Sequence, residues 1–225
     1  MLYDFHTHTS LSDGTLSPIE LIRRAIVNNY NTIALTDHAA TGLLKRIIED
    51  TAEVCALARS HWNILAIPGI ELTHVPVQAI AETAKRAKES GAWIVVVHGE
   101  TLIEPVEKGT NLAALHSPHV DILAHPGLLS LEEAQLAATN GVFLEISARK
   151  GHCLTNGHIA SLAQQVGAKL LLNSDTHNEQ DLLTTSLANA IIHGAGLDGD
   201  ACHQVLNINP QALIEKFSLR HKLKQ

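Results

Sequence analysis

The stretch LYDFHTH, at residues 2–8, passes directly from an apolar run of strand length into two histidines. The same succession recurs along the chain, where a short apolar run ends and a side chain that can bind a metal follows. The seven runs, with the side chains that follow them, are 2–5 with His6 and His8, 32–36 with Asp37 and His38, 64–67 with Glu71, 93–97 with His98, 120–124 with His125, 142–144 with Glu145, and 169–172 with Asp175 and His177. Side chains at the ends of parallel strands converge on one face of an α/β barrel, where such folds carry their active sites.

Segments with helix signals separate these runs. Ser17-Pro18-Ile19-Glu20 and Ser130-Leu131-Glu132-Glu133 are capping boxes that begin two predicted helices. Further helices are predicted at about residues 42–60, 76–90 and 156–166, after Asn178 as a cap, and as a pair at 199–217 that is interrupted by Asn209-Pro210. The βα order, repeated about seven times, predicts a parallel sheet. A barrel is favoured over an open doubly wound sheet, because side chains from all seven strand ends can meet only in a closed ring.

The chain is expected to form a single domain over residues 1–225, with a C-terminal helical tail from about residue 199. Barrels of α/β type often run about 200–250 residues as one unit. The longest irregular stretch, at about residues 99–110, directly follows a predicted strand. Loops in that position often carry function, so this stretch is a candidate active-site loop.

The composition argues against several classes of protein. No apolar stretch reaches the roughly 18 residues that a membrane span needs, and the chain starts in a predicted strand, so we expect a cytoplasmic protein. Cys55, Cys153 and Cys202 show no CxxC spacing, which argues against a disulfide framework or a zinc ribbon. The net charge is -7, and no long Lys/Arg run exists apart from a short basic tail at residues 220–224. Binding to long nucleic acid is therefore not expected.

The histidines of the opening stretch are the first sign of a metal site. On an extended strand, His6 and His8 point to the same side, so both imidazoles can reach one cation. Such a pair alone is weak support, but the other strand ends add His98, His125, Glu71, Asp175 and His177. Together these side chains predict a multinuclear site. Imidazole and carboxylate ligands suit Zn²⁺, Mn²⁺ or Fe.

The side chains at the strand ends form six short motifs. These are Asp4-Phe5-His6-Thr7-His8 with Asp13-Gly14, Leu35-Thr36-Asp37-His38, Gly69-Ile70-Glu71, Val97-His98, Ala124-His125-Pro126 and Ser174-Asp175-Thr176-His177. In this order the motifs resemble those of the PHP (polymerase and histidinol phosphatase) family, and the resemblance covers nearly the whole chain. It implies a distorted (β/α)7 barrel of parallel strands that holds three divalent metal ions and hydrolyses phosphoesters.

The resemblance also implies a set of ligands. The first metal is held by His6, His8, Glu71 and Asp175. Glu71 bridges to a second metal, which also takes His98 and His125, and the third metal is held by Asp13, His38 and His177. Some family members have histidine at the position of Asp13, and an aspartate makes this third site harder. Two ions about 3.5–4 Å apart can share a hydroxide that attacks phosphorus.

Other polar side chains near the strand ends are candidates for supporting roles. Asp37 is expected to orient a ligand histidine or to protonate the leaving group, with a structural turn as the alternative. His38 and His177 are the other candidates for this acid. Glu145 is expected to end a strand and to reach the site or its surroundings. Glu100 and Glu104 are expected to be solvated, with contact to a cationic part of a substrate as the alternative. The roles of His74 and Cys153 stay open.

The loop after residues 142–144 carries the clearest basic cluster near the predicted catalytic face. Arg149, Lys150 and His152 are candidates for binding a phosphate group. An arginine pairs with phosphate through two hydrogen bonds, and a lysine adds a point charge. A solvated loop is the alternative interpretation.

The leading functional hypothesis is a metal-dependent phosphatase, similar to histidinol phosphatase, whose partner is a small phosphorylated metabolite. A nuclease or nucleotide phosphodiesterase that acts on short substrates is the second hypothesis. A third is an amidohydrolase-type C–N hydrolase, since such barrels also begin with HxH and end with a late aspartate. Many of those enzymes need a bridging lysine, whereas Glu71 is suited to bridge here. A scaffold that keeps its metals for stability alone is the non-enzymatic alternative.

Overall fold

The computed structural model describes residues 2–221, with side chains described up to Ser218. Its strands are β1 (Leu2–Asp4), β2 (Tyr30–Leu35), β3 (His38–Ala39), β4 (Leu65–Leu72), β5 (Ile94–His98), β6 (Ile122–Ala124), β7 (Phe143–Ser147) and β8 (Leu170–Asn173). All the pairings are parallel, and the order is β1-β2-β4-β5-β6-β7-β8, with the short β3 paired to β4. The predicted parallel sheet of successive strands is confirmed.

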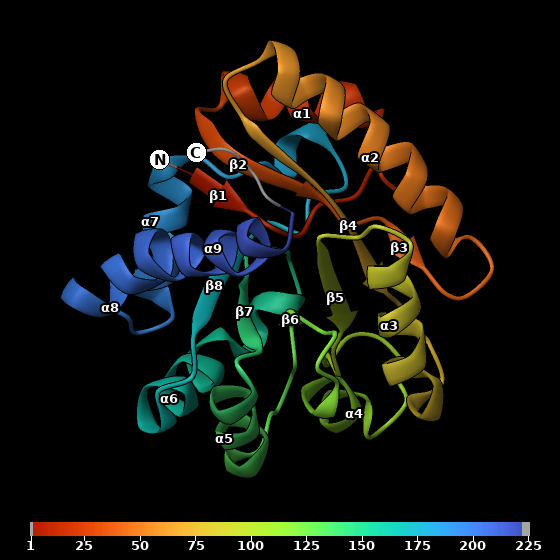
Figure 1. Cartoon of the computed structure of the whole chain (residues 1–225). Coiled ribbons are helices and arrows are strands. Elements are labelled where there is room, and N and C mark those ends of the chain that lie inside the picture. Colours follow the sequence, from red (N-terminus) through yellow and green to blue (C-terminus); the bar gives the residue numbers. More distant parts are fainter. Residues whose placement is uncertain (1, 222–225) are drawn as a thin grey trace.

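Helices connect the strands and surround them, as Figure 1 shows. They are α1 (Pro18–Val27), α2 (Leu44–His61), α3 (Ile80–Glu89), α4 (Thr110–His116), α5 (Leu131–Asn140), α6 (Asn156–Val166), α7 (Thr185–Gly194), α8 (Gly199–His203) and α9 (Asn209–His221). A π-helical turn, Gln204–Ile208, joins α8 to α9. The outer core lies between the strands and this layer of helices, where residues such as Val95 and Val97 of β5 are buried.

The sheet closes into a barrel where the segments after β1 and β8 meet. The backbone amide of Asp175 donates to the carbonyl of His6 at 3.0 Å, and the amide of His8 donates to the carbonyl of Thr176 at 2.8 Å. Thr7 and Thr176 form a parallel bridge at the same place. The first and last strands are therefore joined through their C-terminal extensions, which confirms the predicted distorted barrel.

Alternation of side chains along the strands fills the barrel with an apolar layer. The interior cluster includes Tyr3, Phe5, Ala34, Ile67, Ile94, Val96, Ile122, Ala124, Phe143 and Leu171. Side chains two residues apart point to the same face of a strand. Glu71 on β4, His98 on β5 and Glu145 on β7 therefore occupy the inward positions that follow this layer. A polar layer thus rests directly on an apolar one.

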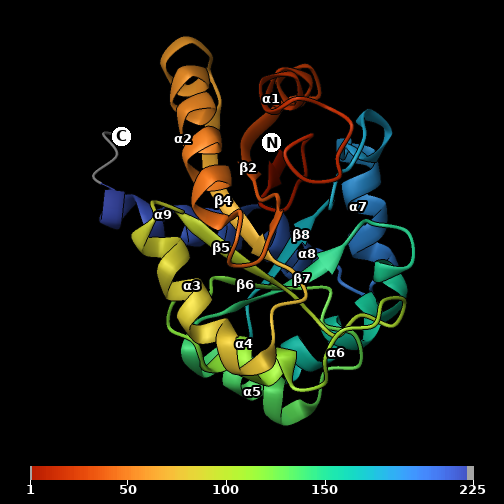
Figure 2. The same cartoon turned by 90° about the vertical axis from the view of Figure 1, so that its right-hand side faces the viewer.

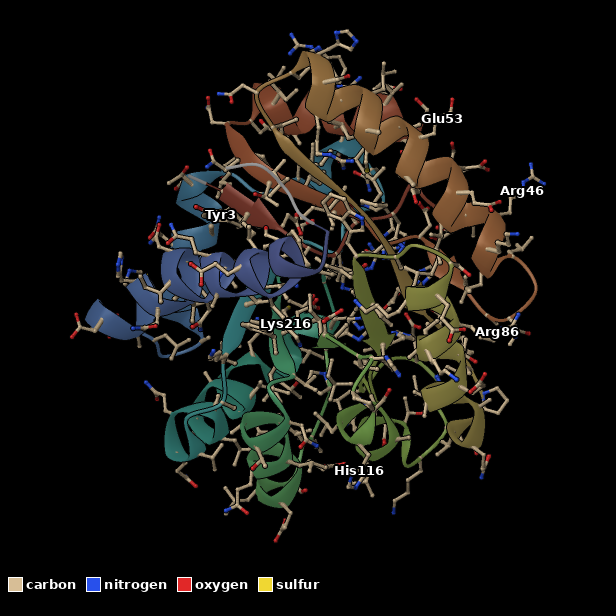
Figure 3. The ribbon with its side chains drawn as sticks, viewed as in Figure 1. Tyr3, Arg46, Glu53, Arg86, His116 and Lys216 are labelled. Carbon is tan, nitrogen blue, oxygen red and sulfur yellow. The ribbon has the colours of Figure 1, made fainter. Side chains whose placement is uncertain are left out.

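Helix α9 closes the opposite end of the barrel. Leu213 and Phe217 pack against the interior cluster, and the ring centroids of Phe217 and Trp93 are 5.8 Å apart. Lys216 pairs with the buried carboxylate of Asp121 at 3.3 Å, and Figure 3 shows Lys216 over this end. In Figure 2, α9 lies at the left of the barrel, and the loop after β7 lies at the right.

Several elements differ from the sequence-based prediction. β4 continues through Pro68, whose carbonyl accepts from the amide of Trp93, so Glu71 lies within the strand instead of beyond it. Glu145 likewise lies within β7. Helix α4 was not predicted, since its few apolar residues follow an irregular loop. The capping box at Ser130 is confirmed, but the side chain of Ser17 makes no cap hydrogen bond, and Pro18 occupies the first turn of α1.

The C-terminal segment was only partly predicted. The helix pair exists, but its break is the π-helical turn, and Asn209-Pro210 begins α9 because proline is tolerated in a first helical turn. Asn178 caps a single 3₁₀ turn, Glu179–Asp181, and accepts from the amide of Gln180. The side chains of the predicted basic tail, residues 220–224, lie outside the described residues. Within residues 2–221, no helix has both the length and the apolarity of a membrane span.

Truncating Leu213 tests the packing of α9 under the barrel. We expect Leu213→Ala to lower the free energy of unfolding by about 2–5 kcal/mol, because it leaves a cavity beneath the apolar layer. The matched control is Leu57→Ala on α2, where the side chain is 53% exposed. Its expected effect is below about 0.5 kcal/mol. Equilibrium unfolding in urea measures both values, and equal losses would contradict this packing.

Candidate metal centre

A cavity of about 510 Å³ opens at the C-terminal ends of the strands. Its lining residues are Asp13, His38, Ala39, Ala40, Gly42, Leu43, Thr73, His74, His98, Glu104, His125, Arg149, His152, Asp175 and His177. They follow strands from β1 to β8, so the barrel brings together side chains that are far apart in the sequence. The candidate ligands meet at the floor of this cavity and just beneath it.

The innermost cluster joins the two ends of the barrel seam. The Nε2 atom of His6 lies 3.3 Å from Oε1 of Glu71, and Nε2 of His8 lies 3.2 Å from Oδ1 of Asp175. His6 also approaches Asp175, at 3.8 Å, and His8 approaches Glu71, at 3.8 Å. All four residues are almost completely buried. Two carboxylates and two imidazoles therefore surround one small volume.

A second group shares Glu71 with the first. Oε1 of Glu71 lies 3.6 Å from Nδ1 of His98 and 3.7 Å from Nε2 of His125. The two histidine nitrogens are 3.3 Å apart, and both side chains are buried. The carboxylate of Glu71 thus faces both groups, which is the arrangement that a bridging ligand requires.

A third group lies nearer the cavity mouth. Oδ1 of Asp13 is 3.2 Å from Nε2 of His177 and 3.5 Å from Nε2 of His38. His8 stacks on the His38 ring, with centroids 4.0 Å apart, and belongs to the same set of potential ligands. The turn that carries Asp13 is closed by Gly14, where a Cβ atom would lie 2.4 Å from the carbonyl oxygen of His8. A side chain at position 14 would displace this turn.

All nine predicted ligand residues therefore lie in one continuous cluster. Their potential ligand atoms form sets whose members lie within 4.8 Å of one another, among them His8-Asp13-His38-His177, His6-Glu71-His125 and His6-His8-Asp175. The assignment of each residue to an individual metal stays a prediction. One difference from the resemblance is that His8 also faces the third group.

The hydrogen bonding of the cluster fits bound cations. Within the described residues, the buried side-chain nitrogens and oxygens that lack a hydrogen-bond partner belong to His6, His8, Glu71, His125, Glu145 and Asp175. Leaving one such group unpaired costs about 1–3 kcal/mol, and more if it is charged. A divalent cation among these atoms would satisfy several at once. The residues present therefore fit a metal centre.

Three residues of the cluster already have the protonation that metal binding needs, whereas burial raises the pKa of Asp175 and, against the effect of burial, nearby carboxylates raise the pKa of His6, so a cation would displace protons from these two. Burial lowers the pKa of His8 and of His125 well below the usual histidine value, which keeps both imidazoles neutral. Burial opposes ionisation of Glu71, but the nearby charges of His6, His38 and His98 lower the pKa of Glu71 well below its usual range. Neutral imidazole and ionised carboxylate are the forms that bind metals.

Hydrogen bonds from outside the cluster orient its rings. Nδ1 of His6 lies 2.8 Å from buried Glu145, which leaves Nε2 directed at the cluster. Nε2 of His98 lies 2.7 Å from Glu104, which leaves Nδ1 directed at Glu71 and His125. Carboxylates in such positions fix the tautomer of a ligand histidine and strengthen it as a donor. Glu145 and Glu104 are therefore positioning residues of the candidate site.

The role of Glu104 was not recognised in the sequence, where it was expected to be solvated. Its carboxylate also lies 3.3 Å from Nε2 of His152, which comes from another loop. Glu100 was expected to be solvated as well, but its carboxylate accepts from the amides of Gly109 and Asn111 at the start of α4. Both contacts depend on how the loop at residues 99–109 folds back, and no local sequence signal reports that path.

The backbone is strained at two of the candidate ligands. His125 has φ 28° and Asp175 has φ 54°, both in the left-handed region that non-glycine residues rarely adopt. His125 directly follows the end of β6, and Asp175 lies two residues after the end of β8, so both stand where the chain enters the cavity. Such strain costs roughly 1–3 kcal/mol and persists mainly at functional sites.

The other predicted site residues have different outcomes. Both carboxylate oxygens of Asp37 accept hydrogen bonds from Thr9 and Ser12, and Asp37 does not line the cavity. This geometry supports the structural-turn alternative over a role as acid. His38 and His177 line the cavity, and their role as acid stays a prediction.

The basic loop after β7 contributes two of its three predicted residues to the cavity. Arg149 lines it and donates from Nη1 to the carbonyl of Asp175 at 3.1 Å. His152 lines it too, and burial lowers the pKa of His152 to about 4, so this ring is neutral. Lys150 is exposed and lies outside the cavity. Cys153 lies outside it as well.

Comparison with protein families gives a match to the PHP domain over residues 4–105, from β1 into the loop after β5. An uncharacterized protein of Methanocaldococcus jannaschii is 46% identical over 218 residues, which cover 96% of this chain and 100% of that protein. A protein of Shewanella halifaxensis named probable phosphatase is 29% identical over 238 residues, covering 97% of this chain and 93% of that protein.

Two further similarities concern proteins named for RNA processing. The 5'-3' exoribonuclease Rnm of Escherichia coli is 28% identical over 170 residues, which cover 74% of this chain and 50% of that protein. Among solved structures, a chain in the cryo-EM structure of archaeal ribonuclease P with mature tRNA superposes with a TM-score of 0.73 at 15% identity, covering 98% of this chain and 94% of that chain. At this identity the superposition supports the barrel fold alone.

Removing His8 tests the metal centre, because this residue faces two of the three groups. We expect His8→Ala to lower the amount of divalent metal that copurifies with the protein, measured by elemental analysis. The matched control, His116→Ala, removes an exposed histidine at the periphery and should leave metal content unchanged (Figure 3). Equal metal content in the wild type and His8→Ala would contradict a ligand role for His8.

Proposed function

This chain belongs to the PHP domain family, and we propose that it is a metal-dependent phosphatase acting on a small phosphate monoester. One observation carries the proposal. A cluster of imidazoles and carboxylates that fits divalent cations forms the floor of a cavity whose wall carries the guanidinium of Arg149. The similarity to a probable phosphatase along almost the whole chain supports the same conclusion.

The residues in and around the cluster have separate roles in the proposed hydrolysis. Divalent ions, when bound by these ligands, polarise phosphoryl oxygens and lower the pKa of water toward about 7. Glu145 and Glu104 hold His6 and His98 with one ring nitrogen toward the cluster. The apolar layer beneath excludes bulk water from the floor, which strengthens every electrostatic interaction there.

Arg149 binds the phosphate in this proposal. Its Nη1 donates to the carbonyl of Asp175, and its Nε lies 3.6 Å from Oδ2 of Asp175, so the guanidinium is held against the cluster. The side chain is 31% exposed, which leaves donors free toward the cavity. A planar guanidinium matches two phosphate oxygens at once.

Cleavage of short phosphodiesters is the second candidate activity. The similarity to the exoribonuclease Rnm over 74% of this chain favours it. The chain spans half of that relative's length, so the activity of the whole relative is itself a hypothesis here. An amidohydrolase-type reaction has less support, because Glu71 stands where a bridging lysine would be needed and no lysine lines the cavity of the described chain.

A pair of chromogenic esters separates the two candidates. We expect the metal-loaded protein to release nitrophenol from p-nitrophenyl phosphate at least about tenfold faster than from bis(p-nitrophenyl) phosphate, because the monoester dianion better matches a cationic centre. A chelator should abolish the activity, and added Mn²⁺ or Zn²⁺ should restore it. A clear preference for the diester would favour the phosphodiesterase, and turnover unaffected by the chelator would contradict a metal-dependent reaction.

The role of Arg149 is tested against its neighbour in the same loop. Arg149→Ala should raise KM for p-nitrophenyl phosphate by about tenfold or more, since a hydrogen bond to a charged group contributes about 1.5–3 kcal/mol. Lys150→Ala removes the same charge from an exposed side chain outside the cavity and should leave KM within about twofold. Steady-state kinetics measure both variants. Similar changes in KM for the two variants would indicate a general effect of positive charge and would contradict phosphate binding by Arg149.

A further inference from the structure

His152 lies beside the candidate metal centre, although it comes from the loop after β7. Its ring stacks on the His125 ring, with centroids 4.0 Å apart and 23° between the planes. Nε2 of His152 lies 3.9 Å from Oδ2 of Asp175, and the potential ligand atoms of these three residues lie within 4.8 Å of one another. All three residues are buried. This group was not expected from the sequence, where His152 was a candidate for binding phosphate.

The carboxylate of Asp175 divides its two oxygens between two sets of histidines. Oδ1 lies 3.2 Å from Nε2 of His8 and 3.8 Å from Nε2 of His6. Oδ2 lies 3.8 Å from Nε2 of His125 and 3.9 Å from Nε2 of His152. His152 therefore stands as near to Oδ2 as His125 does, and His125 is one of the candidate ligands. Zn²⁺ binds nitrogen and oxygen at about 2.0–2.2 Å, so ligand atoms around one ion lie about 3–4 Å apart.

Thr101 holds the ring of His152 with one nitrogen toward the centre. Oγ1 of Thr101 lies 2.7 Å from Nδ1 of His152, and both residues are buried. This contact leaves Nε2 facing Asp175 and the cavity. A histidine that binds a metal through one nitrogen usually donates a hydrogen bond from the other. With a cation at Nε2, the Nδ1 atom would carry the proton and donate to Thr101. His6 is oriented in the same way by Glu145.

We propose that His152 is a further metal ligand of this chain, which binds a divalent cation together with His125 and Asp175. The inference rests on the metal centre of the proposed function, and it adds a tenth side chain to the nine candidate ligands. Two imidazoles and one carboxylate leave one position for water or substrate in the four-coordinate geometry that zinc prefers. Imidazole donors suit Zn²⁺ and Fe²⁺ better than Mg²⁺, so Zn²⁺ is the appropriate probe of this site.

Two neighbouring side chains compete for the same atoms. Nε of Arg149 lies 3.6 Å from Oδ2 of Asp175, and Oε1 of Glu104 lies 3.3 Å from Nε2 of His152. If these contacts satisfied both atoms, His152 would be left to contact phosphate, as expected from the sequence. A phosphate contact affects the binding of substrate alone, whereas a ligand affects the binding of the ion before any substrate is present. Metal binding by the substrate-free protein therefore separates the two roles.

Zinc binding tests the proposal directly. The full chain is stripped of metal and titrated with Zn²⁺ against a chromophoric chelator of known affinity, which gives the number of bound ions and their Kd values. We expect His152→Ala to weaken the binding of one ion by at least about tenfold, because even the loss of a side chain that orients a ligand costs about 10–100-fold. Thr101→Val keeps the shape of the side chain but cannot accept from Nδ1, and it should weaken the same ion about tenfold. Equal Kd values in the wild type and His152→Ala would overturn the proposal.

Two further variants separate a lost ligand from a disturbed fold. His152→Phe keeps a ring against His125 but has no nitrogen, so it should weaken the same ion as His152→Ala does. His158→Ala is the matched control, since Nε2 of His158 contacts the carbonyl of Leu129 at 2.7 Å and the residue lies outside the cavity. Its zinc binding should equal that of the wild type. Added imidazole should restore zinc binding to His152→Ala, because the cavity is open, and should have no effect on His152→Phe, where the new ring fills the place.

Hydrolysis of p-nitrophenyl phosphate by the Zn²⁺-loaded wild type distinguishes a failure of this inference from a failure of the proposed function. Weakened binding of one ion in His152→Ala, together with a wild type that hydrolyses no phosphoester, would support the ligand and reject the phosphatase. Unchanged zinc binding in His152→Ala, together with a raised KM for p-nitrophenyl phosphate, would reject the ligand, leave the phosphatase intact and assign His152 to the phosphate.

Discussion

The joint between the two ends of the barrel decides both the fold and the chemistry. Residues 5–8 and 173–176 meet there through backbone hydrogen bonds such as that from the amide of Asp175 to the carbonyl of His6. The same short segments supply His6, His8 and Asp175 to the cluster of candidate ligands. Closing the ring and assembling the cluster are therefore one event. A barrel that failed to close would keep most of its apolar layer but would lose the geometry of the centre.

Once the ring is closed, alternation along the strands stacks a polar layer on an apolar one. Ile94 and Val96 fill the interior, and His98, at the next inward position, faces the cavity. Buried carboxylates and imidazoles in this position are unfavourable unless cations join them. Glu145 and Glu104 add two further carboxylates, which orient the rings of His6 and His98. The groups that cost most to bury are therefore the same groups that fit a metal centre.

Much of this arrangement could be predicted from the sequence. Short apolar runs followed by histidine or an acid located the seven ring strands and eight of the nine residues of the cluster, since the ends of parallel strands in a barrel converge on one face. Asp13 follows no such run and was predicted only from the resemblance to the PHP family. The two-residue β3 and helix α4 carry too few apolar residues for any periodicity to be visible. The role of Glu104 depends on a loop held by tertiary contacts, such as the approach of Gly127 to the carbonyl of Glu100. Asp37 looked catalytic because it precedes His38, but Thr9 and Ser12 occupy both of its oxygens.

Helix α9 has a consequence for how the protein is made. The apolar interior is contributed by strands along the whole chain, whereas Leu213 and Phe217, which cover its lower end, come later in the sequence than every strand. During synthesis on the ribosome the ring can form before its base is covered, and the Trp93 ring then lacks the cover of Phe217. A nascent chain at that stage exposes apolar surface to chaperones and to neighbouring chains, and this surface is buried once α9 has folded against the barrel.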